Sequence, residues 1–283
     1  MPTTPVRRGI VPALAALLLG LSPCSAQGPQ LKIFDSHLHY NIEASPFFTL
    51  ERVLDVFRRN AVGGIVANSR PNRGTQQLVE AKAPDLKVVP FIRPYRVQSD
   101  VQNWYNDPAI YELIETEYKR GYYRGVGEFH LFGQQAEGEW VKKTVEFAVA
   151  RDLYMLAHSD ADAVLILLRH NPKAKVIWAH TGFGTPTAKV REMLEAHPTL
   201  WAELSYRSGI TEFDGKLSAE WRDLFARHSD RFVLGSDTWV NQRWSEYDST
   251  MRGYRGWLAQ LPADQATRIA RGNAERLFDV KMD

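Results

Sequence analysis

Eight strand-like apolar runs, separated by helix-patterned stretches, constrain the fold of this chain more than any other feature. We predict strands at residues 32–39, 63–70, 88–93, 125–131, 154–158, 176–180, 200–206 and 232–237. Helical stretches lie between them, among them residues 50–60, 109–120, 139–151, 161–169, 187–196 and 219–228. Strict alternation of strand and helix predicts a parallel α/β sheet. Eight units favour closure of that sheet into a (β/α)8 TIM barrel.

The alternative architecture is an open doubly wound sheet. That fold carries a glycine-rich phosphate turn after its first strand, and no such turn follows residues 32–39. Residues 27–283 have the usual length of one barrel, and no Gly/Ser linker or change of composition divides them. We therefore expect a single barrel domain over 27–283.

Residues 1–26 have the features of a secretory signal peptide. Arg7 and Arg8 precede an apolar stretch at 10–21, and the small residues Ser25 and Ala26 provide a cleavage site before residue 27. The stretch is too short to span a bilayer as a helix, and no later segment is long and apolar enough. We expect a secreted or periplasmic protein without a membrane span. Lipoprotein anchoring at Cys24 and twin-arginine export are the alternatives.

Charge and cysteine content exclude several classes of protein. The chain has 35 Lys+Arg and 33 Asp+Glu, and Arg7 and Arg8 lie in the leader, so the mature protein is neutral. A neutral protein has no overall attraction to nucleic acid or anionic lipid. Cys24 is the only cysteine, which excludes disulfides, Cys-ligated zinc and a catalytic thiol after cleavage. The oligomeric state stays open.

Polar side chains that can bind a metal stand where the predicted strands end, which is where a barrel of this kind has its active site. His37 and His39 are two residues apart and therefore face the same side of their strand. Buried polar groups at these positions need a common partner, and four imidazoles with two carboxylates suit zinc or a similar ion. The candidate ligands are His37, His39, Glu128, His158, His180 and Asp237.

A single histidine after a strand is more often a hydrogen-bonded structural residue than a ligand. The same arrangement at five strands makes the metal-site interpretation stronger than the structural one. His130 lies on the same face as Glu128. Two roles are open for it: it lines the pocket, or it supports a metal ligand. Asp35 shares the inward direction of His37, and we expect it to accept the second N–H of an imidazole.

The order His37-x-His39, Glu128, His158, His180, Asp237 resembles the amidohydrolase superfamily of metal-dependent barrel hydrolases. The segment Gly272-Asn273-Ala274-Glu275-Arg276-Leu277-Phe278 resembles the closing helix of its amidohydrolase-related branch.

Many binuclear members carry a carboxylated lysine on the fourth strand, whereas this chain has Glu128 and no lysine nearby. Glu128 is similar to the TatD branch, where such a residue bridges two metals. The resemblance implies one or two divalent ions, and we favour two.

The resemblance also implies roles for two of these residues. A bound Zn²⁺ lowers the pKa of water to about 7. Asp237 would orient that water and carry its proton to the leaving group. His180 would bind a second ion or, with a single ion, polarise the scissile carbonyl.

Arginines and aromatic residues follow several of the same strands. Guanidinium groups pair with carboxylates through two parallel hydrogen bonds, so arginines at one rim predict a small anionic substrate. Pairing with local acids such as Glu203 is the alternative. An apolar wall for a ring is expected from Tyr206, Trp239 and Trp244. The candidate arginines are Arg70, Arg93, Arg96 and Arg207.

These observations predict a metal-dependent hydrolase that acts on a small carboxylate-bearing amide, ester or lactone. A decarboxylase of the same family is the first alternative, because its metal polarises a substrate without hydrolysis. A phosphoesterase comes next, and a catalytically inactive periplasmic binding protein comes last. Retention of all six ligand-type residues, including Asp237, argues against an inactive site.

Overall fold

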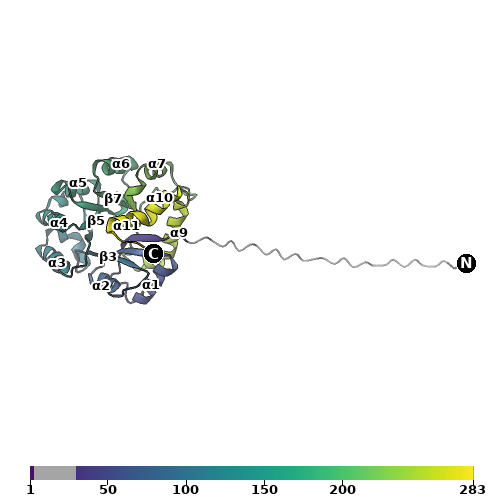
Figure 1. Cartoon of the computed structure of the whole chain (residues 1–283), viewed down its shortest axis with the longest axis horizontal. Helices are drawn as coiled ribbons and strands as arrows, with labels where there is room; N and C mark the ends of the chain where they lie inside the picture. The colour runs from purple at the N-terminus through teal and green to yellow at the C-terminus, as the bar shows by residue number, and fades with distance from the viewer. Residues whose placement is uncertain (3–29, 283) are drawn as a thin grey trace. The chain divides into compact units, whose positions relative to one another are not determined.

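Eight parallel strands form the centre of the structure and neighbour one another in chain order (Figure 1). The structure is a computed structural model, and it describes residues 1–2 and 30–282. Most of the predicted signal peptide, with its cleavage site and Cys24, therefore lies outside the described residues. The strands are β1 Ile33–Leu38, β2 Val62–Ala67, β3 Lys87–Ile92, β4 Gly125–Leu131, β5 Tyr154–Ser159, β6 Lys175–Trp178, β7 Leu200–Glu203 and β8 Phe232–Val233.

The sheet closes on itself between its last strand and its first. Asp35 in β1 forms a parallel bridge with Leu234, directly after β8, and the Ser36 amide donates a hydrogen bond to the Leu234 carbonyl at 2.7 Å. The chain thus forms the (β/α)8 barrel that the alternating pattern predicts. Closure brings the carboxyl ends of all eight strands to one rim.

Helices surround the barrel. The α-helices are α1 Leu50–Arg59, α2 Arg73–Glu80, α3 Pro108–Tyr118, α4 Glu139–Ala150, α5 Ala161–His170, α6 Thr187–Ala196, α7 Ala219–His228, α8 Asn241–Ser245, α9 Tyr247–Leu258, α10 Ala263–Thr267 and α11 Asn273–Phe278. Short 3₁₀ segments are η1 Gln98–Gln102, η2 Trp104–Asn106, η3 Gly133–Glu137, η4 Ala179–Gly182 and η5 Ser229–Arg231, and η6 Arg268–Gly272 is a π-helix. None of the helices in the described part of the chain is long and apolar enough to cross a membrane.

Local sequence explains where several of these helices begin. The side chains of Thr49, Asp107, Asp160 and Ser218 accept hydrogen bonds from amides in the first turns of α1, α3, α5 and α7. Such capping satisfies backbone donors that have no partner within the helix, and it typically contributes about 1 kcal/mol.

The C-terminal helix closes the amino-terminal end of the barrel. Phe278 at the end of α11 contacts Phe34, Phe91 and Tyr154, with ring centroids 5.2–5.9 Å apart. Figure 1 shows α11 lying across the middle of the strand ring. The segment that resembles the closing helix of the amidohydrolase-related branch therefore plugs the barrel, which leaves the opposite rim for a site.

The last three strands are shorter than predicted. The predicted runs extend to His180, Tyr206 and Asp237, whereas β6, β7 and β8 end at Trp178, Glu203 and Val233. The reason is local: His180, Tyr206 and Asp237 have φ values of 56°, 50° and 47°, which extended strands exclude. Positive φ costs free energy in residues other than glycine and is often found at functional sites.

Candidate active site

The two histidines of β1 converge on one point. His37 and His39 are fully buried, and their Nε2 atoms lie 3.2 Å apart. Asp237, which follows β8, places Oδ1 3.0 Å from Nε2 of His39 and 3.6 Å from Nε2 of His37. Closure of the barrel between β8 and β1 is what brings these three side chains together.

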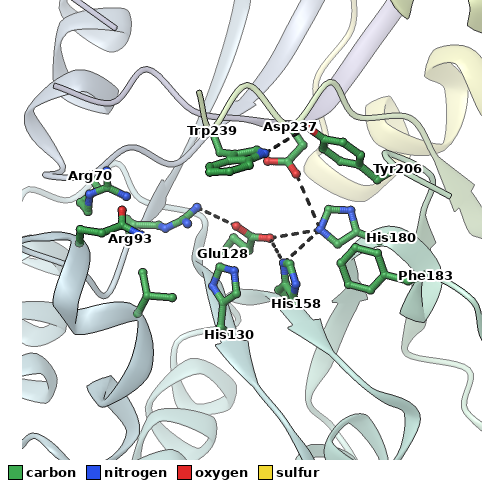
Figure 2. Close-up of a pocket in the computed structure, with 12 residues that line it drawn as sticks. Arg70, Arg93, Glu128, His130, His158, His180, Phe183, Tyr206, Asp237 and Trp239 are labelled. Atoms are coloured by element: carbon green, nitrogen blue, oxygen red, sulfur yellow. Dashed lines mark hydrogen bonds and ion pairs between the residues drawn. The ribbon is translucent and has the colours of Figure 1, made fainter. Parts of the chain in front are cut away.

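Glu128 of β4 lies between this group and a second pair of histidines. Its Oε2 is 3.3 Å from Nε2 of His39, while its Oε1 is 2.8 Å from Nδ1 of His158 and 3.4 Å from Nε2 of His180. Figure 2 shows the carboxylate with Arg93 on one side and these two imidazoles on the other. Glu128 therefore has the position of a carboxylate that bridges two neighbouring sites.

His158 and His180 complete the second group. Nδ1 of His158 and Nε2 of His180 are 3.1 Å apart, and Asp237 Oδ2 lies 3.8 Å from Nε2 of His180. The structure thus brings all six predicted ligands together, although they come from five separate strand ends. Their function as ligands stays a prediction.

The donor set fits divalent cations. Ligand atoms of His37, His39, Glu128 and Asp237 all lie within 4.8 Å of one another. Among the described residues, Oδ1 of Asp237 is buried and accepts no hydrogen bond, because the proton of the His39 ring is on Nδ1 and its Nε2, 3.0 Å away, does not donate. A buried carboxylate oxygen without a donor is costly unless a cation satisfies it. Imidazole nitrogens and carboxylate oxygens at this spacing are typical of zinc and similar ions.

Three of the imidazoles are oriented by acceptors on their outer nitrogens. Nδ1 of His37 lies 3.0 Å from Oε2 of Glu203, Nδ1 of His39 lies 2.5 Å from the Asn68 carbonyl, and Nδ1 of His180 lies 2.9 Å from the Ser205 carbonyl. Carbonyls and carboxylates only accept hydrogen bonds, so each Nδ1 carries the proton. Each Nε2 therefore faces the centre, and in the neutral ring it presents the lone pair that metal ligation requires.

Glu203 is a residue of the candidate site that the sequence patterns do not reveal. It is fully buried at the end of β7, and its carboxylate accepts hydrogen bonds from the His180 amide at 3.0 Å and from the Ser205 hydroxyl at 2.8 Å. In the sequence alone, Glu203 stands only as an acid that could pair with arginines. An acid between the apolar residues Ala202 and Leu204, at the end of a strand, is the signal that could have revealed it.

A glycine makes room for the Glu203 carboxylate. A Cβ at Gly235 would lie 2.4 Å from Oε1 of Glu203 and 2.4 Å from Cβ of His37. These distances are shorter than any side chain tolerates, so this position requires glycine. The close approach of the β8 end allows Glu203 to reach the back of the His37 ring.

Asp35 does not orient an imidazole, which corrects the prediction for this residue. Its carboxylate accepts hydrogen bonds from the Ser236 amide at 2.8 Å and the Tyr247 hydroxyl at 2.7 Å. Two residues along a strand correspond to about 6.6 Å, so Asp35 lies one layer deeper than His37. It joins β1 to the end of β8, while Glu203 occupies the place predicted for it. Burial raises the pKa of Asp35 to about 6.

His130 lines the cavity beside His158. The two rings are stacked with centroids 3.9 Å apart, and the Tyr95 hydroxyl, 3.0 Å away, donates to Nδ1 of His130. That hydroxyl also accepts the His130 amide at 2.7 Å, which fixes its direction. Burial lowers the pKa of His130 to about 3, so the ring is neutral at physiological pH.

The structure brings two of the four predicted arginines into the cavity. Arg93 places Nη1 3.0 Å from Oε2 of Glu128 and 2.7 Å from Oδ1 of Asn68. Arg70 lines the same cavity and donates from Nη2 to Glu43 at 2.6 Å.

Arg96 and Arg207 lie elsewhere, which corrects the prediction of a four-arginine rim. Arg96 is paired with Asp100 and Asp107. Arg207 bonds the Thr185 carbonyl and packs over the Trp221 ring. Their own local partners hold both guanidinium groups away from the cavity.

The cavity has a volume of about 320 Å³ and an aromatic wall. Tyr206 and Trp239 line it as predicted, and the Trp239 Nε1–H donates to the Tyr206 hydroxyl at 3.1 Å. Phe183 also lines it, with its ring centroid 4.4 Å from that of His180. Trp244 does not belong to this wall, because it is buried against Tyr40.

Electrostatics keep the carboxylates ionised. Burial opposes the charge of Glu128, but the charges of His37 and Arg93 outweigh it, so the pKa of Glu128 is well below its usual value. The pKa of Asp237 is likewise lowered, although burial opposes its charge, and the largest lowering effect is the charge of His37. Ionised carboxylates are the form that binds a cation.

An eight-stranded parallel barrel with a buried cluster of imidazoles and carboxylates at its carboxyl rim defines a class of metal-dependent barrel enzymes. The amidohydrolase family model matches residues 50–280. The chain therefore belongs to the amidohydrolase family, as the strand-end residues and the C-terminal segment predict. Membership supports an enzyme of the hydrolase or decarboxylase type.

Solved structures share the fold at low sequence identity. YJJV, a TatD homologue from Escherichia coli K12, has a TM-score of 0.62 and 17% identity over 89% of this chain and 100% of that chain. An amidohydrolase 2 from Bifidobacterium longum subsp. infantis has a TM-score of 0.57 and 14% identity, again over 89% and 100%. An amidohydrolase from Burkholderia multivorans with bound zinc has a TM-score of 0.55 and 18% identity, over 88% and 100%. A comparison with curated proteins found no match.

Proposed function

We propose that this protein is a metal-dependent hydrolase that acts on a small carboxylate-bearing amide, ester or lactone. The observation that carries the proposal is the position of Glu128, whose two oxygens face different groups of histidines, next to the unpartnered Oδ1 of Asp237. That geometry supports two cation sites that share one carboxylate, with a buried acceptor beside them.

We propose that the metal is zinc and that each protein molecule binds two ions. The first site would be formed by His37, His39, Glu128 and Asp237, and the second by Glu128, His158 and His180. When bound, the ions supply Lewis acidity and a hydroxide nucleophile at neutral pH. The outer hydrogen bonds of three of the imidazoles support this assignment, because they direct Nε2 lone pairs toward the shared centre.

Asp237 is the proposed proton carrier. Its carboxylate lies at the cavity wall. With Oδ1 directed at the first proposed cation site, Oδ2 would accept a proton from the attacking water. The carboxyl group then gives that proton to the leaving amine or alcohol. Its lowered pKa keeps it ionised before the reaction begins.

Arg70 and Arg93 are the proposed binding groups for the substrate carboxylate. Both are largely buried, and both line the cavity. A guanidinium group that is buried in low-dielectric surroundings binds an anion more strongly than a solvent-exposed guanidinium group does.

Decarboxylation is a second candidate, and one observation favours it. Nη1 of Arg93 is only 3.0 Å from Oε2 of Glu128. A carboxylate held by Arg93 would therefore lie next to the proposed metal centre, where loss of CO₂ rather than addition of water is an alternative outcome.

We also propose that the protein is exported and cleaved after residue 26, which leaves residues 27–283 as the mature barrel domain. The charged, apolar and small-residue regions of the leader support this proposal. Amino-terminal sequencing of protein from the periplasm or medium tests it. An intact leader on the active protein would refute it.

A substrate screen tests the function itself. Metal-reconstituted protein is assayed with lactones, N-acyl amino acids, aromatic carboxylates and phosphoesters, with Asp237→Asn as the matched control. We expect hydrolysis of a carboxylate-bearing amide, ester or lactone by the wild type only. Release of CO₂ without hydrolysis supports the decarboxylase, and phosphate release refutes both. Ligand-dependent thermal stabilisation without product would instead indicate a binding protein.

A further inference from the structure

The large apolar side chains that are exposed in the described part of the chain lie on one face. Apart from Met1, every one of them follows a strand and precedes the next α-helix, so all lie at the carboxyl rim of the barrel. They are Ile42, Phe47, Val97, Phe132, Phe183, Tyr206, Phe213 and Trp239. Singly exposed apolar residues are ordinary, but a concentration on one face around a cavity indicates binding.

Three of these residues belong to the cavity and to the outer surface at once. Phe183, Tyr206 and Trp239 line the cavity, yet they are 36%, 44% and 52% exposed. Phe183 contacts both His158 and His180, with ring centroids 4.8 and 4.4 Å apart. The apolar wall is therefore continuous from the candidate ligands to solvent.

Two guanidinium groups line the opposite side of the cavity. Figure 2 shows Arg70 and Arg93 on one side of Glu128, and Phe183 and Tyr206 on the other. The cavity thus has a charged end and an apolar end, with the proposed reacting centre between them. A molecule that fills it must match both ends.

We propose that the substrates are amphiphilic amides whose anionic amino-acid part binds at Arg70 and Arg93 and whose apolar acyl group leaves the cavity along Phe183, Tyr206 and Trp239. This inference rests on the proposed hydrolytic function and names its substrate class. A cavity of about 320 Å³ has room for the head and the scissile bond, and the exposed aromatic wall receives the rest of a longer acyl chain.

The reaction balances without a further reactant. The oxygen of water bonds to the acyl carbon as the C–N bond breaks, and one proton passes through Asp237 to the leaving nitrogen. The second proton of the water is released when the new carboxylic acid ionises and ends on the amine, so the products are a fatty or aryl carboxylate and an amino acid with its ammonium group.

A chain-length series tests the proposal. Metal-loaded protein is given acetyl-, butanoyl-, hexanoyl- and octanoylglycine, which share one anionic head. Each methylene that is partly removed from water by the aromatic wall adds to transition-state binding, and we expect kcat/KM to rise about 10-fold from acetyl to octanoyl. The octanoyl-to-acetyl ratio should fall to about 2 or less in Trp239→Ala.

Phe213→Ala is the matched control, because Phe213 is fully exposed on the same face but does not line this cavity. It should keep the wild-type ratio. Turnover with a flat chain-length profile overturns the inference and leaves the proposed function intact. An equal loss of the ratio in both variants also overturns it.

Binding separates failure of this inference from failure of the function. The dissociation constants of the same compounds are measured calorimetrically with the metal-loaded wild type, or with Asp237→Asn where turnover interferes. Binding that tightens with chain length and loses this trend in Trp239→Ala, without any turnover, supports the subsite and refutes hydrolysis. Affinity that does not depend on chain length overturns the subsite. A subunit interface would be indicated instead if Trp239→Ala altered the sedimentation coefficient and not the ratio.

Discussion

The carboxylate of Glu203 accepts a hydrogen bond from Nδ1 of His37 at 3.0 Å, in a fully buried position behind the ring. The same carboxylate accepts the backbone amide of His180 at 3.0 Å. One residue at the end of β7 therefore positions a candidate ligand of each proposed metal site. Acceptors of this kind raise the basicity of the ligand and fix its direction.

We predict that Glu203→Gln weakens metal binding about 10- to 100-fold while the protein remains folded. The amide has nearly the same shape, but it is neutral and orients the imidazole less strongly. Competition with a chromophoric chelator measures the affinity, and circular dichroism measures folding. Glu139→Gln, an exposed acid in the first turn of α4, is the control. An affinity equal to that of wild type would contradict the role of Glu203.

Glu128→Gln should remove about half of the bound metal. The two oxygens of Glu128 face different groups of histidines, and a neutral amide is a poor bridge between two cations. Elemental analysis of the purified variant gives the stoichiometry. Unchanged metal content would mean a single ion that does not depend on this carboxylate.

Asp237→Asn should retain most of its metal and lose turnover by about 100-fold or more, because the amide accepts no proton. The measurement is kcat for a substrate found in the screen, together with metal content. Full activity in this variant would remove Asp237 from the proton-transfer step. Loss of both metal and activity would assign it to ligation alone.

Metal removal should destabilise the barrel. Ligands from β1, β4 and the ends of β5, β6 and β8 share the proposed ions, so metal binds the folded state only. At a free metal concentration of about 100 times Kd, metal binding raises the free energy of unfolding by about 2.7 kcal/mol. For a domain of this size that corresponds to a fall in Tm of about 5–10 °C on chelation. An unchanged Tm after complete metal removal would exclude this coupling.

His130 should make the metal-stripped protein sensitive to acid. Its pKa is lowered from 6.5 to about 3, chiefly by burial, so below about pH 6.5 the unfolded chain binds a proton that the folded protein does not. The stability that this residue contributes is fully present above pH 6.5 and falls with pH, by about 2 kcal/mol between pH 8 and pH 5. His130→Asn should remove that part of the dependence in urea unfolding. If the stability of His130→Asn depended on pH in the same way as that of the wild type, the contribution of His130 would be refuted.

Sequence patterns predicted the barrel and the six candidate ligands for a simple reason. Alternation of apolar strands and amphipathic helices is repeated along the chain, and parallel strands bring their carboxyl ends to one rim. The position of His37, Glu128 or Asp237 after an apolar run therefore places it at that rim without knowledge of any contact.

Contacts between distant segments could not be predicted from the pattern of strands and helices. Asp35 and Glu203 are both acids near the ends of apolar strands, and only the closure of β8 on β1, with Gly235 leaving room, puts Glu203 rather than Asp35 behind His37. Arg96 and Arg93 flank the same short loop, yet local aspartates hold Arg96 away from the cavity. Periodicity along the chain establishes which face a residue occupies, whereas its partner depends on distances across the barrel, which are set when the whole core packs.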